Sequence, residues 1–176
     1  MFLDHHNTGI SMKLEKRLME LTTHSALHHL QPPFGLADHA RLLSSFELHE
    51  EWPLPAPHSR LRHTIYKCDT YELVLMYWGD GSSSSIHGHG GSDCSMRVLK
   101  GEIVEKRYRN FSTTIESSRQ LRAGDVSMIT DELGFHSLHA HNLCVTLHLY
   151  AKPLTIMQVY HAEAMVWISQ PALSFS

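Results

Sequence analysis

Gly79–Gly101, GDGSSSSIHGHGGSDCSMRVLKG, is the stretch that decides the fold. His87 and His89 are two residues apart, so on an extended segment both imidazoles point to the same face. The surrounding glycines leave little bulk to block an approaching ion or substrate. The stretch therefore predicts a sheet that presents two ligands to one metal, with the thiol of Cys94 close by.

Histidine is so frequent in this chain that the pair needs support from its context. With 16 histidines among 176 residues, an H-x-H pair is expected by chance about once or twice. A second pair, His139 and His141, does occur. Spacing alone leaves open that these are surface histidines on a loop rich in glycine and serine.

Composition narrows the class of protein. A chain of 176 residues with 42% hydrophobic residues predicts a single domain over 1–176 with a substantial core. A net charge of -3 without a run of Lys or Arg argues against nucleic acid and anionic membranes as partners. The chain shows neither an apolar stretch of the roughly 20 residues that a membrane helix needs nor the apolar core of a secretory signal, which predicts a soluble, cytoplasmic protein.

The cysteines indicate neither a disulfide framework nor a zinc knuckle, because there are three of them and none forms a C-x-x-C pair. Cys68 and Cys144 are interpreted as ordinary small hydrophobic residues. Cys94 is the one whose surroundings suggest chemistry.

Two amphipathic helices are predicted before the strands begin, over 11–30 and 36–48. Each has apolar residues at helical spacing, and Pro32-Pro33 separates them. We expect these helices, within a scaffold over 1–50, to pack on the outside of a sheet.

The rest of the chain has the pattern of many short strands, predicted over 58–168 as a small antiparallel barrel or jelly roll. Tyr71–Trp78 is a nearly continuous apolar run, as expected of a strand buried on both faces. Cys94–Lys100 and Glu102–Arg109 meet at Gly101 and suggest a hairpin. Further strands are predicted over Val126–Thr130, Gly134–His139, Leu143–Tyr150 and Met157–Ile168.

The strand predicted over Leu143–Tyr150 has two unlike faces. Leu, Val, Leu and Leu alternate with Cys144, Thr146, His148 and Tyr150, so one face is aliphatic and the other carries hydroxyl, imidazole and phenol groups. A buried polar row needs partners, and a ligand site would supply them. An edge strand with its polar face in solvent is the alternative interpretation.

These segments carry a family resemblance. His89, four residues, Cys94, six residues and Gly101 reproduce the first cupin motif, H-x-H-x(3,4)-E-x(6)-G, with cysteine in place of the glutamate. Together with YELVLMYWGDG, SSIHGH, LKGEIVEKRY, ITDELGFH and VTLHLYAKPL, the chain resembles the cysteine dioxygenases of the mammalian type, which are cupins. The resemblance implies a mainly β cupin jelly-roll barrel with the N-terminal helices packed outside it.

The resemblance also implies a set of site residues. Ferrous iron would be held by His87, His89 and His136, with His139 and His141 as competitors for the third place. Cys94 and Tyr150 would form a thioether cross-link. His148 would form a hydrogen bond with the phenol of Tyr150, and Thr146 stands where the family has serine. Arg62 would bind the substrate carboxylate as a bidentate partner, with Arg60 as the alternative.

The implied activity is oxidation of the thiol of free L-cysteine by dioxygen to cysteine sulfinic acid, a step of cysteine catabolism and taurine biosynthesis, by a monomer. Three neutral imidazoles would leave the metal its full charge, so that a thiolate from the substrate is a suitable further ligand. The alternatives are a dioxygenase for 3-mercaptopropionate or cysteamine, and a non-catalytic metal-binding or sugar-phosphate isomerase-like cupin. For a cupin of the last kind we would expect a carboxylate at position 94 and no polar row at 146, 148 and 150.

Overall fold

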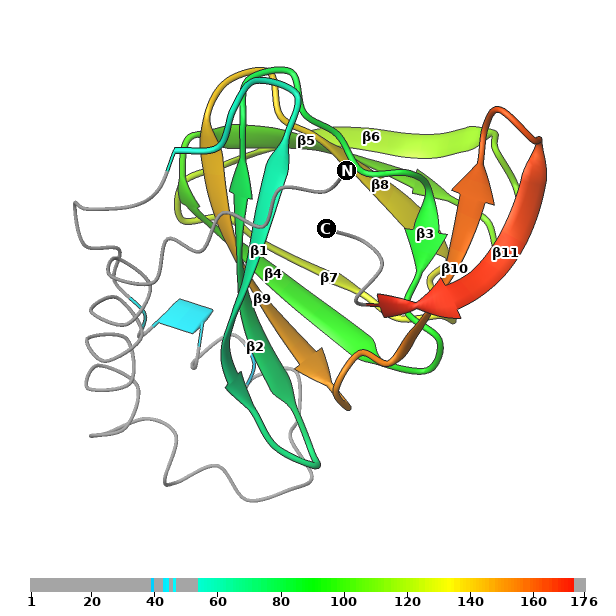
Figure 1. Ribbon diagram of the computed structural model, residues 1–176, viewed down its shortest axis with the longest axis horizontal. Helices are drawn as coiled ribbons and strands as arrows, with labels where there is room; N and C mark the ends of the chain where they lie inside the picture. Colours follow the sequence, from blue (N-terminus) through cyan, green and yellow to red (C-terminus); the bar gives the residue numbers. More distant parts are fainter. Residues whose placement is uncertain (1–38, 40–42, 45, 47–53, 173–176) are drawn as a thin grey trace, which may run out of the picture.

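The computed structural model describes residues 39, 43–44, 46 and 54–172, and within them the chain forms two antiparallel β-sheets (Figure 1). The five-stranded sheet has the order β1 (Arg60–Lys67), β2 (Glu72–Trp78), β9 (Cys144–Ala151), β4 (Asp93–Lys100) and β7 (Val126–Ile129). The six-stranded sheet has the order β11 (Val166–Pro171), β10 (Ile156–His161), β3 (His87–Gly88), β8 (Phe135–His139), β5 (Glu102–Tyr108) and β6 (Ile115–Arg122). The prediction of a mainly β protein is confirmed.

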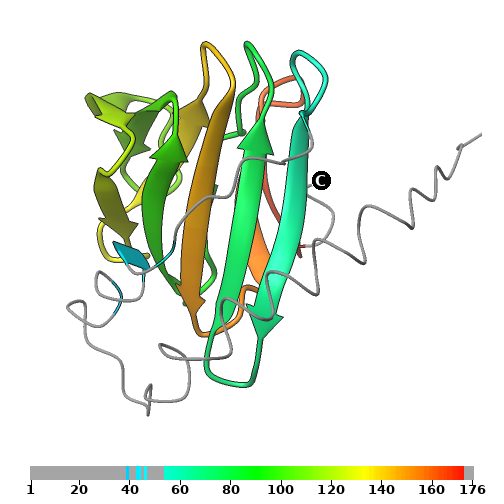
Figure 2. The ribbon, with the colours of Figure 1, turned by 90° about the vertical axis from the view of Figure 1, so that its left-hand side faces the viewer.

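The five-stranded sheet is buried on both faces at its centre. All seven residues of β2 are buried, as the continuous apolar run predicted. The aliphatic face of β9 packs on the outer side of this sheet with Leu73 and Leu75 of β2 and with Leu43. Its polar face points between the sheets, so the interpretation of β9 as an edge strand is wrong. Figure 2 shows β9 between its neighbours.

The predicted hairpin at Gly101 is wrong. β4 pairs with β7 and β9, whereas β5 pairs with β6 and β8, so the chain passes from one sheet to the other at this point. Gly101 has a φ of 75°, and a Cβ there would lie 2.4 Å from the carbonyl oxygen of Leu143. Adjacent apolar runs predict strands but not their partners, and a glycine that allows a tight turn also allows a corner.

Three other strand assignments change. β1 was not predicted as a strand, although it lies within the barrel predicted over 58–168. The segment predicted as one strand over Met157–Ile168 is a pair, β10 and β11, which form a hairpin. β6 was not predicted, because seven of its eight residues are exposed and its sequence IESSRQLR has little hydrophobic alternation.

The predicted N-terminal helices lie largely outside the described residues. Of these segments the structure describes residues 39, 43–44 and 46, and Leu43 is fully buried against the outer face of the five-stranded sheet. Among the described residues, no helix is long and apolar enough to cross a membrane.

Candidate metal centre

Three histidines meet between the sheets because of how three strands pair. β3 lies between β10 and β8, and within it His87 is directly opposite His136 of β8. His89 follows β3 immediately. Because His87 and His89 are separated by Gly88 on extended backbone, both rings point inward. A Cβ on Gly88 would lie 2.3 Å from the ring of Phe135, so this close packing of β3 on β8 requires glycine.

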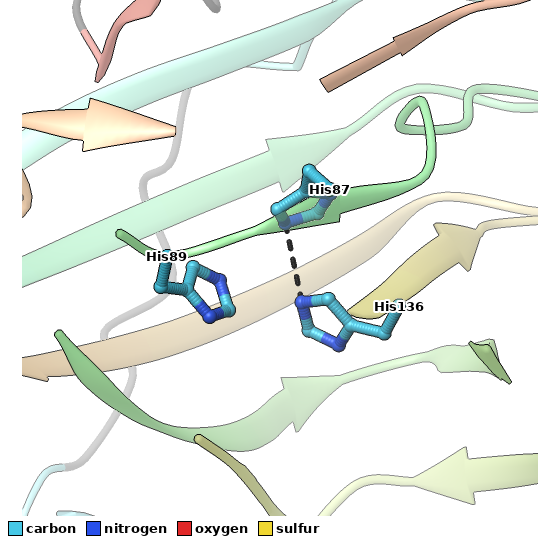
Figure 3. Close-up of side chains that lie close together, drawn as sticks. All are labelled: His87, His89 and His136. Atoms are coloured by element: carbon cyan, nitrogen blue, oxygen red, sulfur yellow. Dashed lines mark hydrogen bonds between the residues drawn. The ribbon is translucent and has the colours of Figure 1, made fainter. Parts of the chain in front are cut away.

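The three imidazoles point toward one another (Figure 3). Their nearest nitrogens all lie within 4.8 Å of one another, and Nε2 of His87 is 3.1 Å from Nε2 of His136. All three residues are buried, with at most 5% of their surface exposed. The structure therefore brings together the three residues that were predicted as ligands.

Hydrogen bonds set the orientation of two of the rings. Nδ1 of His87 lies 2.9 Å from the carbonyl oxygen of Ser85, and Nδ1 of His136 lies 3.0 Å from Oε1 of Glu105. Both acceptors call for a proton on Nδ1, which leaves the lone pair of each Nε2 pointing into the cluster.

His89 is the third ring, and among the described residues neither of its nitrogens has a hydrogen-bond partner. Burial, and then the charge of His136, lowers the pKa of His89 and of His87 well below the usual range. Neutral imidazole is the form that binds metals.

The cluster fits a divalent transition metal. Imidazole nitrogens lie about 2 Å from such an ion, so two of them at right angles around it are about 3 Å apart, which matches the pair of Nε2 atoms at 3.1 Å. A cation would also give a partner to one of the two unpartnered nitrogens of His89. An all-imidazole donor set suits iron, zinc, copper and nickel alike.

Glu105 is a residue of this centre that the sequence analysis did not single out. Its side chain is fully buried, and its second oxygen, Oε2, accepts bonds from Ser127, Arg119 and Arg107 at 2.8–3.3 Å. Burial by itself would raise the pKa of Glu105, but the bonds from His136 and Ser127 and the charge of Arg107 lower it to about 2. A carboxylate at an inward position of the predicted strand was the available signal.

Asp131 holds the histidine-bearing loop and was also missed. Its carboxylate accepts bonds from the backbone amides of His89 at 3.2 Å and of Gly91 at 2.6 Å. Gly91 has a φ of 86°, a conformation that glycine adopts at no steric cost.

The polar face of β9 forms a chain of hydrogen bonds that leads to the cluster. The indole of Trp78 donates to Oγ1 of Thr146 at 2.8 Å, and Thr146 lies 2.8 Å from Nε2 of His148. Nδ1 of His148 is 3.5 Å from the hydroxyl of Tyr150, whose ring centroid is 5.7 Å from that of His89. Trp78 is the member of this chain that the sequence analysis did not predict.

Cys94 lies beside Tyr150, because the two are directly paired between β4 and β9. Its Sγ is 3.9 Å from Nδ1 of His148. Burial, and then the charge of Glu105, raises the pKa of Cys94 above its usual range. The thiol is therefore protonated at neutral pH.

A pocket beside the cluster is lined by Arg60, Arg62, His87, His148 and Tyr150, with apolar side chains over much of the remaining wall. Nη2 of Arg62 lies 2.6 Å from Oε1 of Glu72, and Nη1 donates to Thr64 at 2.7 Å. Glu72 is itself buried and also accepts from the amide of Leu154. Arg62 is thus held in a partly buried ion pair, in which the carboxylate of Glu72 is buried.

Comparisons with known proteins assign the chain to a family. A family model described as "Cysteine dioxygenase type I" matches residues 40–163, which is more than half of the chain. The chain belongs to this family.

Two relatives of this family member are cysteine dioxygenase type 1 from Rattus norvegicus, 31% identical over 115 residues, and from Homo sapiens, 30% identical over 115 residues. Each match covers 58% of this chain and 58% of the relative, so the matched part spans less than two thirds of those proteins. The solved structure of a protein with a double-stranded β-helix domain from Klebsiella pneumoniae is similar to this chain, with a TM-score of 0.50 and 15% sequence identity. The superposition covers 60% of this chain and 82% of the Klebsiella chain. That likeness shows the fold.

The other predicted candidates lie outside the metal centre of this cysteine dioxygenase family member. Nε2 of His139 is 2.8 Å from Oγ of Ser137, and His141 is exposed.

Of the two arginines that line the pocket, Arg60 lies with its guanidinium 5.7 Å from the centre of the Trp78 ring. The positive charge of Arg62 helps to lower the pKa of His148 and opposes the rise in the pKa of Tyr150. The charge of Arg60 helps to lower the pKa of His87. Cys68 and Cys144 are free thiols away from the pocket.

Proposed function

We propose that this protein is an iron-dependent dioxygenase that oxidises the thiol of free L-cysteine to cysteine sulfinic acid. The observation that carries the proposal is the convergence of three buried histidines beside a pocket that also contains Arg62 and Tyr150. Membership of the cysteine dioxygenase type I family supports the same reaction. His87, His89 and His136 would hold Fe(2+), which when bound supplies the redox chemistry that joins dioxygen to a thiolate.

The pocket would orient the substrate through its charges. A guanidinium with free N–H groups binds a carboxylate in a fixed plane, and Glu72 and Thr64 restrict the rotation of the Arg62 side chain. Arg60 lies on the same face of β1 and is the alternative anchor. Apolar side chains on the remaining wall, among them Leu154 and Met157, keep water from the reacting thiol.

Tyr150 would act as a hydrogen-bond donor rather than as an anion. Burial, and then its proximity to Cys94, raises the pKa of Tyr150 well above the usual range, so the phenol keeps its proton. The pKa of His148 is lowered to about 3 by burial, and then by the charges of His136 and Arg62. A neutral His148 that accepts from Thr146 on Nε2 carries its proton on Nδ1, facing the oxygen of Tyr150.

We further propose that Cys94 and Tyr150 form a thioether. The two side chains are cross-strand neighbours in a buried environment, where such pairs are in contact. Formation of the bond between Sγ and a ring carbon removes one hydrogen from each, and dioxygen accepts the two electrons and two protons. The cross-link would fix the position of the phenol.

The activity is tested by anaerobic purification, addition of Fe(2+) and L-cysteine, and measurement of dioxygen uptake and of the sulfinic acid formed. We expect uptake with L-cysteine in excess of that with cysteamine or 3-mercaptopropionate. Equal dioxygen uptake with cysteamine would refute the assignment of L-cysteine as the substrate. No uptake with any thiol would favour a non-catalytic metal-binding protein.

The carboxylate anchor is tested by Arg62→Met combined with Glu72→Gln, so that no buried carboxylate is left unpaired, and by Arg60→Met as the matched control. Loss of a charged hydrogen-bond pair should raise the KM for L-cysteine roughly 10–100-fold. The KM for cysteamine, which has no carboxylate, should change little. If Arg60→Met shows this pattern and the Arg62 variant does not, Arg60 is the anchor.

The cross-link is tested by intact mass. Protein isolated after turnover should be lighter by two hydrogens, and the difference should map to joined peptides that contain Cys94 and Tyr150. Cys94→Ser, which keeps a small polar side chain, should show the unmodified mass. A wild-type mass unchanged after turnover would remove this part of the proposal. The monomeric state and the cytoplasmic location stay predictions.

A further inference from the structure

Glu105 divides its two oxygens between different tasks. Within the described part of the chain, the bonds from Arg107, Arg119 and Ser127 all go to Oε2, whereas Oε1 accepts from Nδ1 of His136. A carboxylate present only to neutralise two arginines could present both oxygens to them as a bidentate pair. Here one oxygen faces the candidate metal ligand.

The position of Glu105 follows from strand pairing. In the ladder between β5 and β8, His136 is opposite Arg107 and Glu105 is opposite Leu138. Glu105 and His136 are therefore diagonal neighbours on the same face of the sheet, within reach of a long side chain. The contact is built into the six-stranded sheet and does not depend on a loop.

The contact determines which nitrogen of His136 can bind a metal. A proton held on Nδ1 by the carboxylate leaves Nε2 with its lone pair, 3.1 Å from Nε2 of His87. His87 has the equivalent support from a backbone carbonyl, and among described residues His89 has none. Glu105 is thus the charged side chain that orients one ligand of the cluster.

We propose that Glu105 is a positioning residue for metal binding, which holds His136 with Nε2 toward the cluster while Arg107, Arg119 and Ser127 hold Glu105 through its other oxygen. This inference rests on the proposed metal-dependent function and deepens it. Carboxylates that bond the second nitrogen of a metal-bound histidine contribute about 10–100-fold to metal affinity.

The test compares Glu105→Gln with Arg119→Gln in the full chain, with Co(2+) as the probe and no thiol present. Glu105→Gln either turns its amide N–H toward His136, which moves the proton to Nε2, or keeps a weaker acceptor and leaves the arginines unpaired. We expect its affinity for Co(2+) to fall about 10–100-fold. Arg119→Gln leaves Ser127 and Arg107 on Oε2, so its affinity for Co(2+) should fall far less than that of Glu105→Gln.

A second measurement separates this role from a structural one. Thermal unfolding of the metal-free proteins reports the loss of buried ion pairs, which both variants share. If Glu105→Gln loses stability but binds Co(2+) as wild type does, or if Arg119→Gln loses as much affinity as Glu105→Gln, the proposal is wrong. Should Glu105→Gln fail to fold, Glu105→Asp decides in its place, because it keeps the charge for the arginines but shortens the reach toward His136.

The readout does not depend on the reaction. A protein that binds Co(2+) and shows the expected loss in Glu105→Gln, yet does not oxidise cysteine, would refute the proposed function and leave this inference standing. A wild-type protein that does not bind Co(2+), Zn(2+) or Fe(2+) would refute both.

Discussion

The buried ring of His89 lowers the stability of the metal-free protein. His89 is 1% exposed, and neither ring nitrogen has a hydrogen-bond partner among the described residues. A buried polar group without a partner destabilises a protein by about 1–3 kcal/mol. In contrast, the nitrogens of His87 and His136 that face away from the cluster are satisfied by Ser85 and Glu105. His89 is therefore the ligand that most needs a cation.

Replacing His89 should separate folding from metal binding. In His89→Leu an apolar side chain of similar size takes the place of the unpartnered ring, so the metal-free variant should unfold at the same or a higher temperature than metal-free wild type. Metal binding should be lost, since two ligands remain. Calorimetry of both proteins with and without Zn(2+) measures the two effects. A metal-free variant that is much less stable than wild type would show that the His89 ring has partners when folded.

At the scale of elements, the site depends on the close approach of β5 and β8. Gly134 immediately precedes β8, two residues before His136, and has a φ of 104°. A Cβ there would lie 2.3 Å from the backbone carbonyl oxygen of Tyr108 in β5. The glycine thus permits the pairing that places His136 opposite β3 and beside Glu105.

Gly134→Ala should therefore displace β8, and Gly124→Ala is a matched control. Gly124 has a similar φ of 98°, but nothing lies within 4 Å of the position of its Cβ. Both variants incur backbone strain of about 1–2 kcal/mol, and only Gly134→Ala adds a clash with backbone. We expect Gly134→Ala to lose clearly more stability in urea and to bind Co(2+) more weakly. Equal losses in the two variants would contradict a role for this contact.

At the scale of the whole molecule, the polar interior makes stability depend on pH. The pKa values of His87, His89 and His148 are all lowered by burial, that of His148 to about 3 from the usual 6.5. The unfolded chain therefore binds more protons than the folded protein once the pH falls below about 6.5. Each such group lowers the free energy of unfolding by about 1.4 kcal/mol per pH unit in that range. The contribution of Glu105 is lost later, as the pH falls from 4.5 toward about 2.

We expect metal-free protein to unfold at a lower urea concentration at about pH 5 than at pH 7.5, by the linkage above. Bound metal should increase the difference between the urea midpoints at the two pH values, because protons compete with the metal for neutral imidazoles at low pH. Unfolding midpoints at a series of pH values, with and without Zn(2+), measure both effects. A midpoint for the metal-free protein that does not change between these pH values would show that folding does not lower the pKa values of these histidines.

Much of the centre could be predicted from the sequence, because its residues lie in segments with strong local patterns. The alternation of β9 identified the polar row, and the spacing of His87 and His89 identified a shared face. Residues that contact the site residues through hydrogen bonds, without lying in a recognisable motif, were missed by the sequence analysis. Glu105 and Trp78 reach the centre from strands whose partners are not encoded locally, and the hairpin assigned at Gly101 was wrong for the same reason.

The sequence by itself determined that the chain is mainly β, which faces of its strands are polar, and the family whose motifs it carries, since side-chain alternation and motif spacing are local properties. The tertiary structure alone decided that Arg62 is paired with Glu72 and that Glu105 faces His136. It also brought His136, which the resemblance had implied, into the cluster in place of its competitors His139 and His141. These are relations between strands distant in sequence, and they depend on sheet order and register, which are set by the packing of the whole barrel.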